Sequence, residues 1–107
     1  MTAPADVVVV LCSAPAAAAE ALATKLVEEQ LCACVNVSAP VRSVYRWQGV
    51  VERAEELLLL VKTTAAAADR LSQRLVELHP YDVPEVLVLP VAGGHAPYLQ
   101  WVADSVR

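Results

Sequence analysis

The segment 79–85, His-Pro-Tyr-Asp-Val-Pro-Glu, concentrates side chains that can do chemistry. It offers an imidazole, a phenol and two carboxylates on a backbone that its two prolines restrict. Imidazole and carboxylate groups bind divalent metals, and a rigid loop would hold them in place. His79 is therefore a candidate metal ligand, with Tyr81 and Glu85 beside it. In the competing interpretation the segment is a helix stop, where a protonated His79 complements the negative end of the helix dipole.

The three cysteines, Cys12, Cys32 and Cys34, form a second group of candidate ligands. Side chains alternate along a strand, so Cys32 and Cys34 fall on one face, and thiolates favour Cu(I) or Zn. A single C-x-C lacks the second pair that zinc motifs carry. A reduced cysteine also packs well as a small apolar residue. Metal ligation and simple burial both stay open for these thiols.

Other polar and aromatic positions have two interpretations each. Lys62, at the end of a leucine-rich strand, is an anion partner or that strand's solvated end. Tyr98 and Trp101 fit helix packing better than a stacking platform. The acidic stretch around Glu52 and Glu56 predicts a solvated face or salt bridges between subunits. No nucleophile elbow, P-loop or dinucleotide fingerprint is present, so the sequence predicts no enzyme.

The elements that must position these residues follow from hydrophobic period and turn signals. A valine-rich strand is followed by a helix that Ser13 would cap, and a hairpin turns at Gln48 and Gly49. Pro40 interrupts the hairpin's first arm. The order β-α-β-β-α-β predicts an α+β, ferredoxin-like split βαβ fold with an extra C-terminal helix, in a single domain over 1–107. The expected strands span 6–12, 32–47, 50–62 and 85–91, and the expected helices 13–30, 65–78 and 97–105.

The long hairpin between the second and third strands predicts an oligomer. Arms of about 13 residues would each reach about 40 Å, whereas a domain of this size has a radius of gyration near ~13 Å. The hairpin would then overhang the body and expose Val44, Tyr45, Trp47, Val50 and Val51 near its tip. Exposed apolar patches and open strand edges mark partner surfaces, so we expect a homo-oligomer joined by this hairpin.

Composition excludes several classes of protein. The chain has 107 residues, a net charge of −4 and scattered basic residues, which argues against nucleic-acid binding. Its apolar runs are far shorter than the ~18 residues that a membrane-spanning helix needs. No basic residue precedes Lys25, as a secretory signal would require. We therefore expect a cytoplasmic protein with reduced thiols and neither nucleic-acid nor membrane partners.

Several motifs together resemble the CutA divalent-ion-tolerance family. They cover nearly the whole chain, from about residue 7 to 105, in a consistent order. The motifs are VVVLCSAP (8–15), LCACVNV (31–37), SVYRWQG (43–49), LLLVKT (58–63), HPYDVPEVLVLP (79–90) and YLQW (98–101).

The resemblance implies a cytoplasmic homotrimer linked to tolerance of divalent cations, notably copper, with no organic cofactor and no accepted reaction. Copper ligation in the family is associated with positions that match Cys12 and His79, and Cys34 matches the family's usual cysteine. Some members carry a second histidine where this chain has Leu78. The family's recurring polar and aromatic positions, which would line a cleft between protomers, match Lys62, Tyr81, Glu85, Tyr98 and Trp101.

Three hypotheses remain open at this stage. The first is a metal-responsive binding protein in which His79, with Cys12 or Cys34, ligates copper or another divalent cation. The second is a PII-like signalling or scaffold trimer, in which Lys62, Tyr81 and Trp101 bind a small anion in the cleft between protomers. The third is an unknown enzyme, for which His79 and Glu85 are the available acid and base groups.

Overall fold

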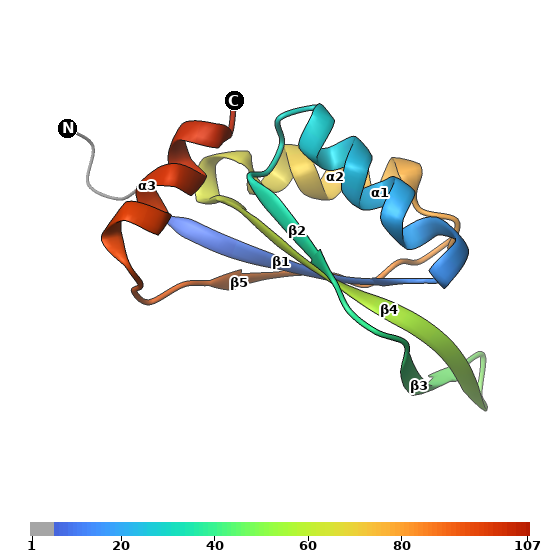
Figure 1. Cartoon of the computed structure of the whole chain (residues 1–107). Coiled ribbons are helices and arrows are strands. Elements are labelled where there is room, and N and C mark those ends of the chain that lie inside the picture. The colour runs from blue at the N-terminus through green and yellow to red at the C-terminus, as the bar shows by residue number, and fades with distance from the viewer. Residues whose placement is uncertain (1–5) are drawn as a thin grey trace.

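A computed structural model describes residues 6–107 of the chain. The predicted domain 1–107 stays a prediction, and its residues 1–5 lie outside the described part. Figure 1 shows one layer of helices over one β-sheet. The elements are β1 (Val7–Ala14), α1 (Ala16–Glu28), β2 (Cys34–Val37), β3 (Val41–Trp47), β4 (Val50–Thr64), η1 (Ala65–Ala67), α2 (Ala68–Leu78), β5 (Val86–Pro90) and α3 (Ala96–Ser105).

The sheet is antiparallel, with strand order β2-β4-β1-β5 and β3 paired to the outer part of β4. This α+β arrangement agrees with the predicted split βαβ order, with β2 and β3 as one arm broken near Pro40. The hairpin turn is tight because Gln48 and Gly49 both adopt positive φ, which glycine tolerates best.

The hairpin extends beyond the body, as its length predicts. The molecule measures 51 × 26 × 23 Å, with a Cα radius of gyration of 14.5 Å. Figure 1 shows β3 and the outer half of β4 as the part that projects. Val44 is 61 % exposed and Trp47 is 45 % exposed, so apolar side chains lie on this projection.

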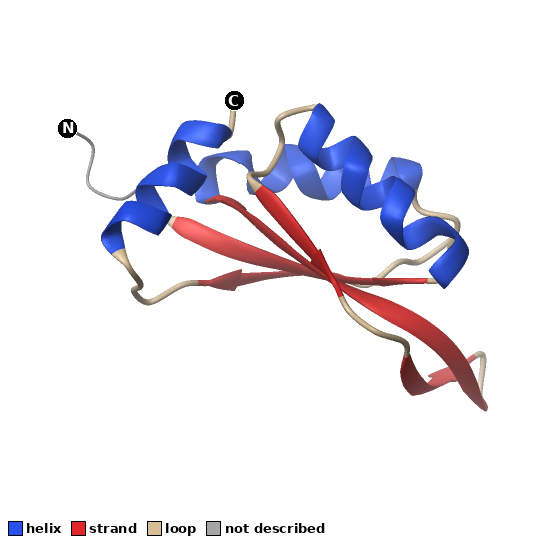
Figure 2. Cartoon of the chain, in the orientation of Figure 1, coloured by secondary structure: helices blue, strands red, loops and turns tan. Residues whose placement is uncertain are grey.

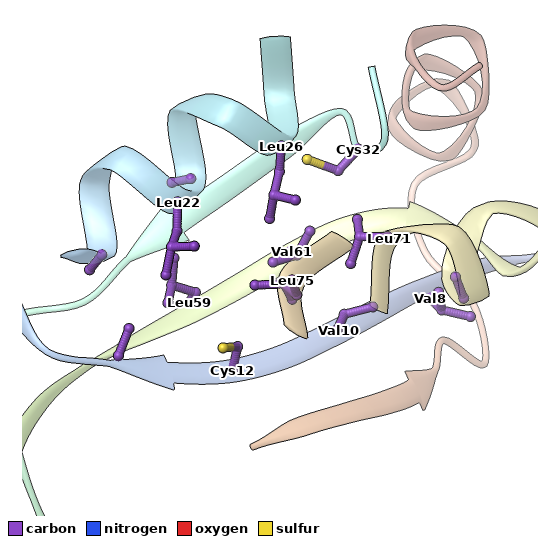
Figure 3. Close-up of a cluster of buried hydrophobic side chains, with 14 residues drawn as sticks. Val8, Val10, Cys12, Leu22, Leu26, Cys32, Leu59, Val61, Leu71 and Leu75 are labelled. Atoms are coloured by element: carbon purple, nitrogen blue, oxygen red, sulfur yellow. The ribbon is translucent and has the colours of Figure 1, made fainter. Parts of the chain in front are cut away.

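The core lies between the sheet and α1 and α2. Leu26, Leu59, Leu71 and Leu75 are fully buried there, and alanines of α1 let that helix lie close to the strands. Figure 3 shows these leucines meeting between the helices and the sheet, with the sulfurs of Cys12 and Cys32 among them. No helix within residues 6–107 combines the length and hydrophobicity needed to cross a membrane.

The helices α1 and α2 cover only one face of the sheet (Figure 2). Leu59 and Val61 point to that face, so the alternate residues of β4 point to the other. We call this second surface the open face. It carries side chains from all four paired strands, among them Leu11, Asn36, Glu56, Leu60, Lys62, Leu87 and Leu89. Leu60, Leu87 and Leu89 are substantially exposed, so the open face is apolar and uncovered within the protomer.

The predicted start of the first helix needs correction. Ser13 does not cap a helix, because it belongs to β1; α1 begins at Ala16 after an extended Pro15 and has no side-chain cap. The carbonyl of Pro15 accepts from the N–H groups of Ala18 and Ala19 instead. The second helix begins with the 3₁₀ turn η1, which Thr64 caps, because its hydroxyl accepts from the N–H of Ala67.

Candidate functional site

His79 ends α2 with extended backbone dihedral angles, and Pro80 follows it. The imidazole is buried, and its Nε2 lies 2.7 Å from the carbonyl oxygen of Ser13. The backbone N–H of Tyr81 donates to Nδ1 over 3.1 Å. Because Nδ1 accepts, Nε2 carries the proton and donates to Ser13. The ring is therefore neutral in this arrangement, which is contrary to a protonated His79 that complements the helix dipole.

Tyr81 links the same loop to β4. Its hydroxyl donates to Oε2 of Glu56 over 2.9 Å, and its ring lies 4.7 Å from the His79 ring. Burial raises the pKa of the Tyr81 phenol to about 12, with further contributions from the Glu56 hydrogen bond and charge. Glu56 is only 6 % exposed, so it does not lie on a solvated face, and the alternative of a salt bridge between subunits stays a prediction. The signal was strand alternation, which places Glu56 on the same face as Leu60 and Lys62.

An open groove of about 690 Å³ lies between this loop and strand β3 of the hairpin. Three aromatic rings and three carboxylates contribute to its walls. Among residues 6–107, no lysine, arginine or histidine lines the groove, so its charged lining is acidic. These aromatic and acidic residues are Tyr45, Trp47, Tyr81, Glu56, Asp82 and Glu85.

Cys12 lies in the core rather than in the groove. It is fully buried beside Leu59, its neighbour on β4 (Figure 3). Burial raises the pKa of its thiol to about 12, and the charges of Glu85 and Glu56 add to the effect. A cysteine binds a metal ion as a thiolate, so Cys12 would have to lose a proton whose release its buried surroundings disfavour.

Cys34, Lys62, Tyr98 and Trp101 form a separate group where α3 meets the sheet. Cys34 lies opposite Lys62 in the β2–β4 ladder, and Lys62 Nζ lies 3.8 Å from Cys34 Sγ. The rings of Tyr98 and Trp101 are 5.6 Å apart. Burial raises the pKa of Tyr98, and the charge of Cys34 raises it further. The structure thus divides the candidates into a His79 group, with Tyr81, Glu85 and the adjacent Cys12, and a Lys62 group.

The candidate ligands do not form a complete metal centre in one protomer. Within residues 6–107, no three histidine, cysteine, aspartate or glutamate side chains are arranged to hold an ion. The division described above is the reason, because His79 and Cys34 belong to different groups. His95, the other histidine of the chain, lies just before α3 and is exposed.

The thiols give a direct test of these environments. We expect iodoacetamide at pH 8 to label Cys34 in the native protein and to leave Cys12 and Cys32 unlabelled. Both protected thiols have a pKa of about 12, mainly because of burial, so roughly one in 10⁴ is ionised at pH 8. Peptide mass spectrometry gives the labelled positions, and unfolded protein labelled on all three cysteines is the control. Fast native labelling of Cys12 would contradict the buried placement.

Comparison with known proteins identifies the family. The model of the family described as CutA1 divalent ion tolerance protein matches residues 7–105. The chain belongs to the CutA1 family. The resemblance inferred from the motifs is therefore confirmed over nearly the whole sequence.

Individual CutA relatives agree. The chain is 51 % identical over 87 residues to the divalent-cation tolerance protein CutA of Thermus thermophilus, covering 81 % of this chain and 84 % of the relative. It is 45 % identical to the Pectobacterium atrosepticum protein of the same name, covering 95 % and 94 %. These names describe tolerance and state no reaction.

Solved CutA structures share the fold. The rice CutA1 crystal structure superimposes with a TM-score of 0.95 at 38 % identity, covering 99 % of this chain and 98 % of the other. The Thermus thermophilus structure gives 0.91 at 47 % identity, covering 94 % and 99 %. A Nostoc relative with a TM-score of 0.89 at 36 % identity, covering 94 % and 97 %, is described as a PII-like protein.

Proposed function

We propose that this CutA family member serves divalent-cation tolerance as a cytoplasmic homotrimer that binds a divalent ion, copper first, through His79. The family and the names of its relatives support the tolerance role. The cytoplasm suits three cysteines that are all unpaired in the structure. Relatives are named for chloroplast and periplasm as well, so location varies within the family.

The hydrogen bond that anchors the His79 ring to Ser13 is the observation that best supports metal binding. A metal-binding histidine commonly donates its second ring N–H to a backbone carbonyl, which fixes the ring and its tautomer. The His79 Nε2–H bond to Ser13 is of this kind, since Ser13 belongs to a core strand. Nδ1 is then the ligating atom, and binding requires it to release the N–H of Tyr81.

Oxygen ligands for the ion would come from the acidic groove next to His79, which the imidazole itself does not line. Asp82 and Glu85 line it, and both are exposed. The role of the Cys12 and Cys34 thiols as further ligands stays a prediction. Because thiol ligands must deprotonate, an ion held by Cys12 would bind more weakly as the pH falls.

The trimer is supported by surfaces that one protomer leaves exposed. The hairpin tip and the open face both carry uncovered apolar side chains, which usually mark an interface. In a closed ring, each subunit presents one surface to one neighbour and a different surface to the other. Such contacts would bring the His79 group of one subunit near the Lys62 group of the next. Tyr81, Glu85, Lys62, Tyr98 and Trp101 would then line a shared cleft.

The charge of the groove weighs against a small anion as its ligand. Glu56, Asp82 and Glu85 line it without a basic residue from the same chain. We therefore favour a cation at this position over the anionic ligand of the PII-like alternative.

A calorimetric comparison tests the metal role. We expect Cu(II) to bind the wild-type protein and His79→Gln to lose at least tenfold in affinity, because glutamine can still donate to Ser13 but supplies no imidazole Nδ1. His95→Gln is the matched control, since it removes the other histidine from an exposed loop. An unchanged isotherm for His79→Gln, with the protein still folded by circular dichroism, would contradict copper ligation by His79.

A further inference from the structure

The side chain of Glu56 is buried and forms no ion pair within residues 6–107. Its side chain is 6 % exposed, and the Tyr81 hydroxyl is its hydrogen-bond donor. The ion pairs formed within residues 6–107 join Glu29 to Lys25 and Arg74, and Arg74 to Glu77, and none includes Glu56. Buried carboxylates are rarely left without a charged partner, because desolvation disfavours the ionised form. The environment of Glu56 therefore lacks a cation.

Lys62 is complementary to Glu56 but cannot reach it in the same chain. Both side chains emerge on the open face of β4, where alternate residues share a side. Six residues of extended strand separate them by about 20 Å. The neighbour of the Lys62 ammonium is the sulfur of Cys34 at 3.8 Å, which carries no formal charge as a thiol.

The other basic residues point elsewhere. Lys25, Arg70 and Arg74 belong to α1 and α2, on the opposite side of the sheet. The three hairpin arginines fall on the side away from the groove, since Arg42 pairs with Glu55 and Arg46 with Val51 in the β3–β4 ladder. Arg53 shares that side, and Arg107 follows α3. All eight basic residues lie within the described range, which leaves Lys62 as the cation of the open face.

We propose that Lys62 of one subunit forms an ion pair with Glu56 of the next across the open faces, so that each groove is completed by a neighbouring copy of this chain. This inference rests on the proposed homotrimer. In a ring of head-to-tail contacts every Glu56 and every Lys62 forms one ion pair, because each subunit contributes both residues. The apolar side chains of Leu60, Leu87 and Leu89 surround the pair on the same face and would exclude water from it.

A charge exchange tests the pair. We expect Glu56→Lys and Lys62→Glu each to weaken self-association about tenfold or more, since close interfacial charge pairs couple strongly. The double variant should recover most of the wild-type association, because its interfaces again join opposite charges. Native mass spectrometry over a dilution series reads the oligomer. Glu20→Lys, the same charge change at an exposed position of α1 on the other side of the sheet, is the control that should leave association unchanged.

A double-mutant cycle with smaller changes keeps the test valid if the charge reversals prevent folding. Glu56→Gln keeps an acceptor for the Tyr81 hydroxyl, and Lys62→Met keeps the length of the side chain. We expect the two single losses not to add in the double variant, since both remove the same pair. If the wild type is a trimer but the two single variants lose association additively, or the charge exchange restores none, the Glu56–Lys62 pair is wrong and the homotrimer is still supported. A wild-type monomer would overturn both.

Discussion

Replacing Leu59 with alanine should lower the free energy of unfolding by about 3–5 kcal/mol. Leu59 is fully buried in β4, between Cys12 of β1 and Val37 of β2. Truncation removes apolar contacts and leaves a cavity, because strands fixed on both sides cannot close the gap. Equilibrium unfolding in guanidinium chloride, followed by circular dichroism at one protein concentration, measures the change.

Leu60→Ala is the matched control, one residue along the same strand. Leu60 points to the open face and is 37 % exposed in the protomer. In the isolated protomer this truncation should change the free energy of unfolding little, and the loss should grow with protein concentration if a second copy covers the open face. Equal losses for Leu59→Ala and Leu60→Ala at every concentration would contradict the assignment of the two faces.

Local sequence signals predict most of the elements because those signals act over short distances. Gln48-Gly49 fixes the hairpin turn, Pro40 breaks the first arm, and Pro80 follows the end of α2 at Leu78. The misplaced helix start shows the limit of this approach. Serine is a residue type favoured at helix N-caps, but Ser13 pairs with Leu58 and so stays in the sheet. That pairing depends on a distant segment of the chain.

The site was harder to predict because its contacts join distant parts of the chain. His79 and Tyr81 are conspicuous in the sequence, but the anchor of His79 is a backbone carbonyl 66 residues away. Backbone carbonyls have no sequence signature. Glu56 follows other charged residues, which predicts either a solvated face or a salt bridge between subunits. The register of β4 excludes the solvated face, because it places Glu56 under Tyr81. Register is a property of the whole sheet, so composition alone did not reveal it.

Substituting Leu87 with glutamate should abolish the proposed homotrimer while leaving the protomer folded. Leu87 lies on edge strand β5 and is 50 % exposed on the open face, so a single chain can solvate the new carboxylate. In an assembly that covers this face, the same carboxylate would be desolvated among leucines, at a cost of several kcal/mol. We expect sedimentation equilibrium to give the monomer mass and circular dichroism to retain the wild-type spectrum.

Val76→Glu is the matched control for this last substitution. Val76 is 49 % exposed, nearly the same as Leu87, but it lies on α2 on the opposite side of the sheet. It should remain trimeric, because a helix surface outside the interface keeps its glutamate in water. If both variants remain trimers, the open face is not the interface, and assembly must depend on the hairpin tip instead. If Leu87→Glu alone dissociates, the apolar open face is the surface through which this CutA chain assembles.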